Sequence, residues 1–487
     1  MGPSSPKQSA KPEPTTQLSS WISSATLNDI PEEIRVRAKH LILDGLGCGL
    51  LGAHLPSSEK AARAIFDLEP VGDATVIGWP DKKLPSLSAA LLNSAFIQGF
   101  ELDDWHSEAP IHSNSILLPA LFAAAEHVVS KDNKSSLVSG SDILLATIIG
   151  YEVGPRVGLA LHGAHVLTTG WHSGAVFGPA VAASAVGKLL GLTPEQIEDA
   201  FGVACTQACG LMSAQFGSEV KRMQHGFAAR NGLLAAFLAQ GGYIGIKRVF
   251  EQEYGGFLKQ FSSGNGMEPQ YLVDELTKDL GVKWQTQGVR VKPYASMAGT
   301  HPTIDCVRKL QELYPEPMQN WTSDIAKITI ELGEAAFHHG GWKAIRPLTS
   351  TGAQMSNAYV AATQIVYGEV LAAQFRHDML ENDNLWRLVD VTDCVLTKEI
   401  GAPRGRQTVT VEFKDGTVLR QRVDSARGVE PPLSNQEIIE KWRQITKDVI
   451  DIERAEKIER LVLELEKCDD IMLLQGLMGG LTKNPIA

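Results

Sequence analysis

Apolar residues recur at helical spacing through almost the whole of residues 19–280. Asp29, which precedes a proline and two glutamates, predicts a helix cap followed by an acidic first turn. Thr193 is followed three residues later by Gln196, which predicts another capped helix running through Ala208. We also expect helices, rich in Ala and Gly and therefore buried in a multi-layer bundle, at 86–101, 114–130, 142–161 and 174–190.

The pattern changes in the second half of the chain. Ile325–Leu332 alternates apolar and polar residues, which is typical of a half-buried strand. Thr408–Phe413 and Val418–Val423 alternate as well, and the Asp415-Gly416 pair between them is a strong hairpin signal. Residues 434–468 return to the helical pattern, with Glu and Lys on the polar face.

These patterns predict a mainly α protein with two domains. Residues 1–18, rich in Ser, Pro, Lys and Gln, are expected to form a disordered tail. A large all-helical domain is expected over 19–285, completed by 426–487, and a smaller α+β domain over 286–425.

Composition excludes several classes of protein. The 487 residues are 44% hydrophobic and 21% charged, with a net charge of −11, so the basic face of a nucleic-acid binder is not expected. No apolar run is long enough to predict a membrane span, and no signal or transit peptide is recognisable, so we expect a cytoplasmic protein. Six cysteines are too few for a disulfide framework, and Cys205 and Cys209, four residues apart, are expected on one helix face as core thiols.

The segment around Lys221 and Arg222 carries the strongest chemical signal. Two adjacent cations stand among Gly, Ala and Ser, and small residues leave room for a ligand. Cations of this kind neutralise carboxylates, whereas the alternative is a solvated basic turn. No dinucleotide fingerprint, phosphate loop or metal-ligand spacing accompanies them, so we expect no cofactor and no metal.

Several imidazoles and acids lie at predicted helix breaks. Asp103, Asp104 and His112 could form a proton-transfer site, or Asp104 could simply cap the helix that follows. His172 precedes a helix rich in small residues, where it could face an anion or point into solvent.

The second domain offers weaker candidates. His301 lies near its start, and Tyr359, in a helical pattern, could equally be a core residue. His338 and His339 are expected to lie in a strand and to point to opposite faces, which argues against a shared metal ion.

Three segments together resemble the MmgE/PrpD family, and most closely its fungal decarboxylases. They are ELDDWHSEAPIH at 101–112, CTQACGLMSAQ at 205–215 and VKRMQHGFAARNGLL at 220–234, and the similarity extends over about residues 20–470. The resemblance implies a homodimer in which the α+β domain acts as a lid, with the active site between the lid and the helical domain.

By motif match, the resemblance implies catalytic positions for His112, His172, Lys221 and Tyr359. It further implies substrate-binding roles for the segments that carry Asp103, Asp104, Arg222 and His301. Glu101 and Trp105 depart from the residues found in the animal members of the family.

The activity that the resemblance implies is cofactor-free decarboxylation of the small tricarboxylate cis-aconitate to itaconate and CO2. Lys221, helped by Arg222, would hold carboxylate charge, and His112 would donate the proton. His172 would orient a carboxylate and Tyr359 would donate a hydrogen bond. The alternatives are a dehydratase acting on 2-methylcitrate or a related tricarboxylate, and an inactive member that only binds other molecules.

Overall fold

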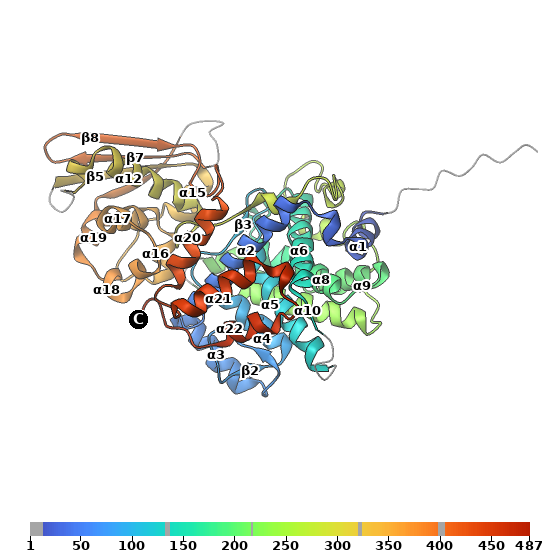
Figure 1. The fold of residues 1–487 in the computed structure, drawn as a ribbon. Coiled ribbons are helices and arrows are strands. Elements are labelled where there is room, and N and C mark those ends of the chain that lie inside the picture. Colours follow the sequence, from blue (N-terminus) through green and yellow to red (C-terminus); the bar gives the residue numbers. More distant parts are fainter. Residues whose placement is uncertain (1–12, 132–136, 216–217, 320–323, 398–404) are drawn as a thin grey trace, which may run out of the picture.

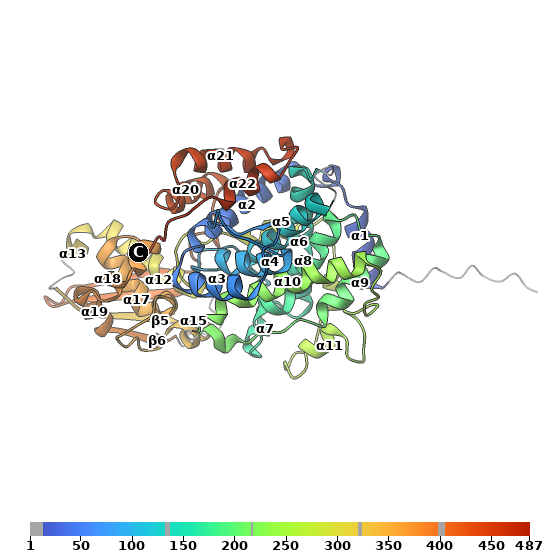
Figure 2. The ribbon, with the colours of Figure 1, turned by 90° about the horizontal axis from the view of Figure 1, so that it is seen from below.

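The structure is a computed structural model and describes residues 13–131, 137–215, 218–319, 324–397 and 405–487. A large helical domain and a smaller α+β domain lie side by side (Figure 1). The N-terminal half of the chain and the C-terminal helices share the first domain, while residues from about 300 to 423 form the second (Figures 1 and 2).

The helical domain is a multi-layer bundle in which α8 and α10 lie at the centre. Its N-terminal part contains α1 (Pro14–Ser24), α2 (Glu32–Gly52), α3 (Pro56–Leu68), α4 (Ser86–Ile97), α5 (Ser113–Lys131), α6 (Gly140–Ala160), α7 (His165–Thr168), α8 (Ser173–Leu189), α9 (Pro194–Cys205), α10 (Val220–Gln240) and α11 (Phe257–Phe261). Small residues let these helices approach closely. A methyl group at Gly178 of α8 would stand 2.7 Å from the Cβ of Ala228 on α10.

Three C-terminal helices complete this domain, namely α20 (Asn435–Thr446), α21 (Ile452–Leu463) and α22 (Met472–Gly479). Helix α20 packs on α2, where the indole of Trp442 lies against Gly47. Trp442 is fully buried, so the last sixty or so residues are part of the core of the first domain rather than an appendage.

The α+β domain is built on a four-stranded sheet of order β6-β5-β7-β8. Strand β5 (Ile325–Leu332) pairs in parallel with β6 (Thr392–Leu396) and antiparallel with β7 (Gln407–Phe413), which pairs antiparallel with β8 (Val418–Val423). The helices of the domain are α12 (His301–Leu313), α13 (Pro315–Gln319), α15 (Glu334–Gly340), α16 (Ser350–Met355), α17 (Asn357–Tyr367), α18 (His377–Leu380) and α19 (Asp383–Asp390). Helices α12 and α17 pack on each other and on the sheet.

Two short strand pairs lie in the helical domain, and one of them connects it to the second domain. Strands β1 (Ala74–Thr75) and β2 (Lys83–Leu84) pair with each other, as do β3 (Trp105–His106) and β4 (Val289–Arg290). Because β4 immediately precedes the α+β domain, this pair ties the interdomain connection to the turn that follows α4.

Local sequence signals were right where the pattern was strong. The β5 strand and the β7–β8 hairpin form as predicted, with Gly416 in the left-handed region at φ 91°. The capping box of Thr193 and Gln196 is also confirmed.

Several local predictions were wrong. Asp29 does not cap α2, because its carboxylate accepts hydrogen bonds from Thr26 in the preceding turn. Helix α9 ends at Cys205 rather than Ala208, which leaves Cys209 outside the helix and exposed. Helix α1 begins at Pro14 and Leu18 is fully buried, so the predicted tail of residues 1–18 extends too far along the chain. Residues 1–12 of that tail lie outside the described residues.

Helix α6 is long and apolar enough to cross a membrane by length and composition alone. In the structure, 89% of its most apolar window is buried inside the protein. It packs against α5 and α8 and is a core helix of the bundle.

Candidate active site

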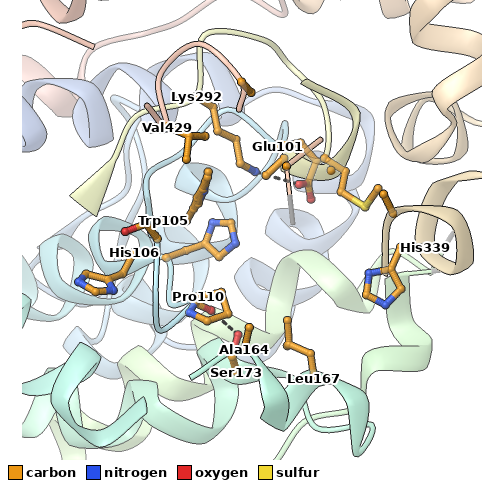
Figure 3. A pocket seen from close by; sticks show the side chains of 18 of the residues that line it. Glu101, Trp105, His106, Pro110, Ala164, Leu167, Ser173, Lys292, His339 and Val429 are labelled. Atoms are coloured by element: carbon orange, nitrogen blue, oxygen red, sulfur yellow. Dashed lines mark hydrogen bonds and ion pairs between the residues drawn. The ribbon is translucent and has the colours of Figure 1, made fainter. Parts of the chain in front are cut away.

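A cavity of about 410 Å³ lies between the two domains. Its wall is formed by residues of both domains and of their connection, among them Glu101, Trp105, His112, Leu167, His172, Lys221, Lys292, Met297, Ala336, His339, Met355 and Gln407. Lys292 and Glu101 lie on one side of this cavity, and Ala164 and Leu167 lie on the opposite side (Figure 3). The cavity therefore has charged groups on one side and the apolar side chains of Ala164 and Leu167 on the other.

Glu101 organises the charged wall. Helix α4 ends at Ile97, earlier than predicted, and Glu101 sits in the following turn with φ 56°, a conformation that non-glycine residues seldom adopt. Its buried carboxylate accepts hydrogen bonds from Lys221 and Arg222, and from Nζ of Lys292 at 3.1 Å. Burial favours the neutral acid, but the three cations hold the pKa of Glu101 well below its usual range.

Three cations share the carboxylate of Glu101, so this cluster carries net positive charge. Lys221 and Lys292 line the cavity, and both side chains are largely buried, at 9% and 2% exposure. Burial lowers the pKa of Lys221 to about 8; Glu101 raises it, and Arg222 and Lys292 lower it further. An anionic ligand at this wall would meet a positive charge that the protein itself only partly neutralises.

Arg222 lies behind this wall and is not among the residues that line the cavity. Besides Glu101, its guanidinium donates to the amide oxygen of Gln354 at 3.1 Å and to the carbonyl of Gln98 at 3.3 Å. The structure therefore places Arg222 as a partner of Glu101 rather than within reach of a ligand.

His112 and Asp103 form a hydrogen-bonded pair beside the charged wall. Nδ1 of His112 lies 3.0 Å from Oδ2 of Asp103. An ionised carboxylate only accepts, so Nδ1 carries the proton and Nε2 is the nitrogen available to a ligand. Asp103 is fully buried; desolvation would raise its pKa, but His112 and Lys292 lower it.

Asp104 caps the helix that follows it, which was the alternative to a role in proton transfer. Its Oδ1 accepts from the backbone N–H of Asn114 at 3.0 Å, in the first turn of α5. Burial and the neighbouring Asp103 raise its pKa well above the usual range. Asp104 is not among the cavity-lining residues.

His172 immediately precedes α8 and lines the cavity. Burial, with Lys221 as the next cause, lowers its pKa to about 3, so the ring is neutral at physiological pH. Its buried Nδ1 has no hydrogen-bond partner within the described part of the chain. A neutral imidazole in this position can orient a ligand through a hydrogen bond but adds no positive charge.

The structure does not bring His301 or Tyr359 to the cavity wall. His301 is buried at the start of α12, where Nε2 donates to the carbonyl of Ser296 at 3.1 Å. The hydroxyl of Tyr359 lies 3.5 Å from the carbonyl of Met379, and its ring packs with Phe375. Both side chains are therefore held by the interior of the α+β domain, because the helices that carry them turn these faces toward its core.

His338 and His339 lie in helix α15, so the strand expected for this pair was wrong. His339 reaches the cavity from the α+β domain (Figure 3). Within the described residues, no three His, Cys, Asp or Glu side chains are grouped to hold a metal ion.

Sequence reasoning underrated two residues of the charged wall, Glu101 and Lys292. From the sequence alone, Glu101 was only a departure from the animal members of the family, and Lys292 had no predicted role. The two are 191 residues apart, and the β3–β4 pair brings their segments together.

Comparison with known proteins identifies the chain's relatives. The model of the MmgE/PrpD N-terminal domain matches residues 16–270, and that of the MmgE/PrpD C-terminal domain matches residues 294–467. A cis-aconitate decarboxylase-like protein of Aspergillus oryzae is 50% identical over 96% of this chain and 97% of its own length. Cis-aconitate decarboxylase of Aspergillus terreus is 45% identical over 98% of both chains, and the human enzyme of that name is 26% identical over 96% of this chain and 94% of its own length.

Proposed function

Because the chain belongs to the MmgE/PrpD family, we propose that it is a carboxy-lyase that converts cis-aconitate to itaconate and CO2. A cis-aconitate decarboxylase at 45% identity and a decarboxylase-like protein at 50% identity, both over nearly the full chain, support the reaction. The observation that carries the proposal for the substrate is the charged wall, where Lys221 and Lys292 face the cavity with a single carboxylate, Glu101, between them. A tricarboxylate supplies the negative charge that this wall lacks.

The reaction needs one bond to break and one proton to arrive. The bond between the methylene carbon and its carboxylate breaks and releases CO2, and the electron pair shifts through the allyl system. The former alkene CH carbon then takes a proton and becomes the CH2 of itaconate, while the methylene carbon becomes the terminal =CH2.

His112 is the proton donor in this scheme. Its Nδ1 is held by Asp103 at 3.0 Å, which fixes the orientation of the ring, and its Nε2 faces the substrate. Lys221 and Lys292 bind the carboxylates that remain, and neutral His172 orients one of them. A carboxylate that lies toward Ala164 and Leu167, away from the lysines, would be poorly solvated, which favours its loss as CO2.

Proton NMR of the purified protein with cis-aconitate, without added metal, tests the proposal. We expect the two vinylidene protons of itaconate to appear. His112→Ala and Lys221→Ala should remove most of this signal while leaving the fold intact, and His377→Ala, at an exposed histidine away from the cavity, should not.

Full turnover in His112→Ala or Lys221→Ala would contradict the assigned roles. An unchanged spectrum with the wild type would contradict the assignment of cis-aconitate as the substrate. Loss of water from 2-methylcitrate, without CO2 release, would then support the dehydratase alternative, which uses the same charged wall.

A further inference from the structure

His225 is a buried histidine that the proposed reaction does not use. It lies on α10, one turn after Lys221, and its side chain is fully buried. Its ring centroid is 5.1 Å from that of His112 and 5.1 Å from that of His172. It is not among the cavity-lining residues, whereas His112 and His172 are, so it stands behind these two histidines.

The hydrogen bonds of Ser115 define the tautomer of His225. The Ser115 hydroxyl donates to the backbone carbonyl of His112 at 3.0 Å, and a carbonyl can only accept. The hydroxyl has a single hydrogen, so the 2.8 Å contact between its Oγ and Nδ1 of His225 requires that Nδ1 be the donor. His225 therefore carries its proton on Nδ1 and is linked through Ser115 to the backbone of His112.

The other edge of the ring packs on the start of α8. A Cβ at Gly174, two residues after His172, would collide with Nε2 of His225, so only glycine permits this approach. Nε2 is buried and has no hydrogen-bond partner among the described residues. His225 is thus in contact with the helix turn that carries His172, as well as with His172 itself.

The surroundings keep His225 neutral. The titratable groups that act on it are His172, His112 and Lys221, which disfavour its protonation, and Glu101, which favours it. Burial is the largest cause, and together they hold the pKa of His225 well below its usual range. A neutral ring at this position does not compete with His112 for the proton.

We propose that His225 is a positioning residue that sets His112, through Ser115, and His172, through the first turn of α8, so that both imidazoles face one substrate. This inference rests on the proposed function for its kinetic readout. Its structural part, the Nδ1–H tautomer and the Ser115 link, can be tested without turnover.

The kinetic test compares two amides at position 225. In His225→Asn the side-chain amide can overlie Nδ1 and donate to Ser115, whereas in His225→Gln it reaches toward the place of Nε2. We expect His225→Gln to lower kcat for cis-aconitate by about 10- to 100-fold, the scale of a small misplacement of catalytic groups, with KM little changed because the lysines are untouched. His225→Asn should recover a large part of that loss, and Ser115→Ala should resemble His225→Gln.

Wild-type kcat in His225→Gln would overturn the proposal. So would equal losses in the Asn and Gln variants that follow an equal fall in thermal stability, since a merely structural residue would behave in that way.

Nitrogen-15 NMR of histidine-labelled wild type provides the readout that does not depend on the reaction. We expect one signal pair, absent in His225→Asn, with the proton on Nδ1 and no titration between about pH 6 and 8, where ordinary histidines titrate. A proton on Nε2, or titration in that range, would overturn the inference. If the wild type fails to decarboxylate cis-aconitate but this spectrum is observed, the proposed substrate is wrong and the Ser115 link stands.

Discussion

At the scale of single residues, the cavity is governed by one carboxylate shared among three cations. Glu101 has a left-handed backbone conformation, and its carboxylate accepts hydrogen bonds from Lys221, Arg222 and Lys292. Two of the three cations line the cavity, so substrate charge and Glu101 compete for the same donors. The protonation state of Lys221 then matters directly for binding.

We expect kcat/KM for a tricarboxylate to fall as the pH rises through about 8, the value to which burial lowers the pKa of Lys221. Below that pH the amine is protonated and binds a carboxylate, and above it the charge is lost. A profile of kcat/KM against pH measures this fall. In Lys221→Arg the side chain stays charged, so any remaining activity should not fall as the pH rises through about 8. A wild-type profile that is flat through pH 8 would contradict the assignment.

At the scale of elements, the helical domain depends on small residues at helix crossings. A Cβ at Gly52, the last residue of α2, would collide with the carbonyl oxygen of Phe96 on α4. Helix α4 leads into the turn that carries Glu101, so this crossing also determines where the charged wall lies. Such approaches explain why these helices are apolar on most faces yet contain so much Gly and Ala.

Gly52→Ala should destabilise the fold by about 1–3 kcal/mol, because the added methyl meets backbone that cannot rotate away. The matched control is Gly476→Ala in α22, where a Cβ would meet nothing within 4 Å and where alanine is the better helix former. Thermal unfolding should show a lower midpoint for the first variant and an equal or higher one for the second. Equal midpoints would show that the α2–α4 crossing adapts more readily than its geometry suggests.

At the scale of the whole molecule, the site is assembled where the two domains join. Strand β4 pairs with β3, and two residues further on Lys292 binds Glu101. The α+β domain contributes His339 and Met355 to the wall of the interdomain cavity. The shape of the cavity therefore depends on how the two domains are held together.

The family resemblance implies a homodimer, and we retain that as a proposal. Light scattering coupled to size exclusion should give twice the mass of one chain at micromolar concentration. On dilution, activity per chain should fall only at concentrations where the measured mass also falls from that of a dimer to that of a single chain. A monomer with full activity at every concentration would contradict the proposal.

The sequence by itself determined the elements with strong periodicity and the residues within one motif. Helical spacing, the Thr193 capping box and the β7–β8 hairpin depend on neighbours a few residues apart, and they form as predicted. His112, His172 and Lys221, proposed from their motifs, all line the cavity.

Only the tertiary structure decided the rest. The Glu101–Lys292 pair joins residues 191 positions apart, and the link from His225 to Ser115 joins residues 110 positions apart. The helical pattern around Tyr359 fitted either a core residue or a catalytic one, and the packing of α17 places its side chain in the core. Local patterns report which face of an element is apolar, but not which other element will cover that face, because that choice is made by contacts between distant parts of the chain.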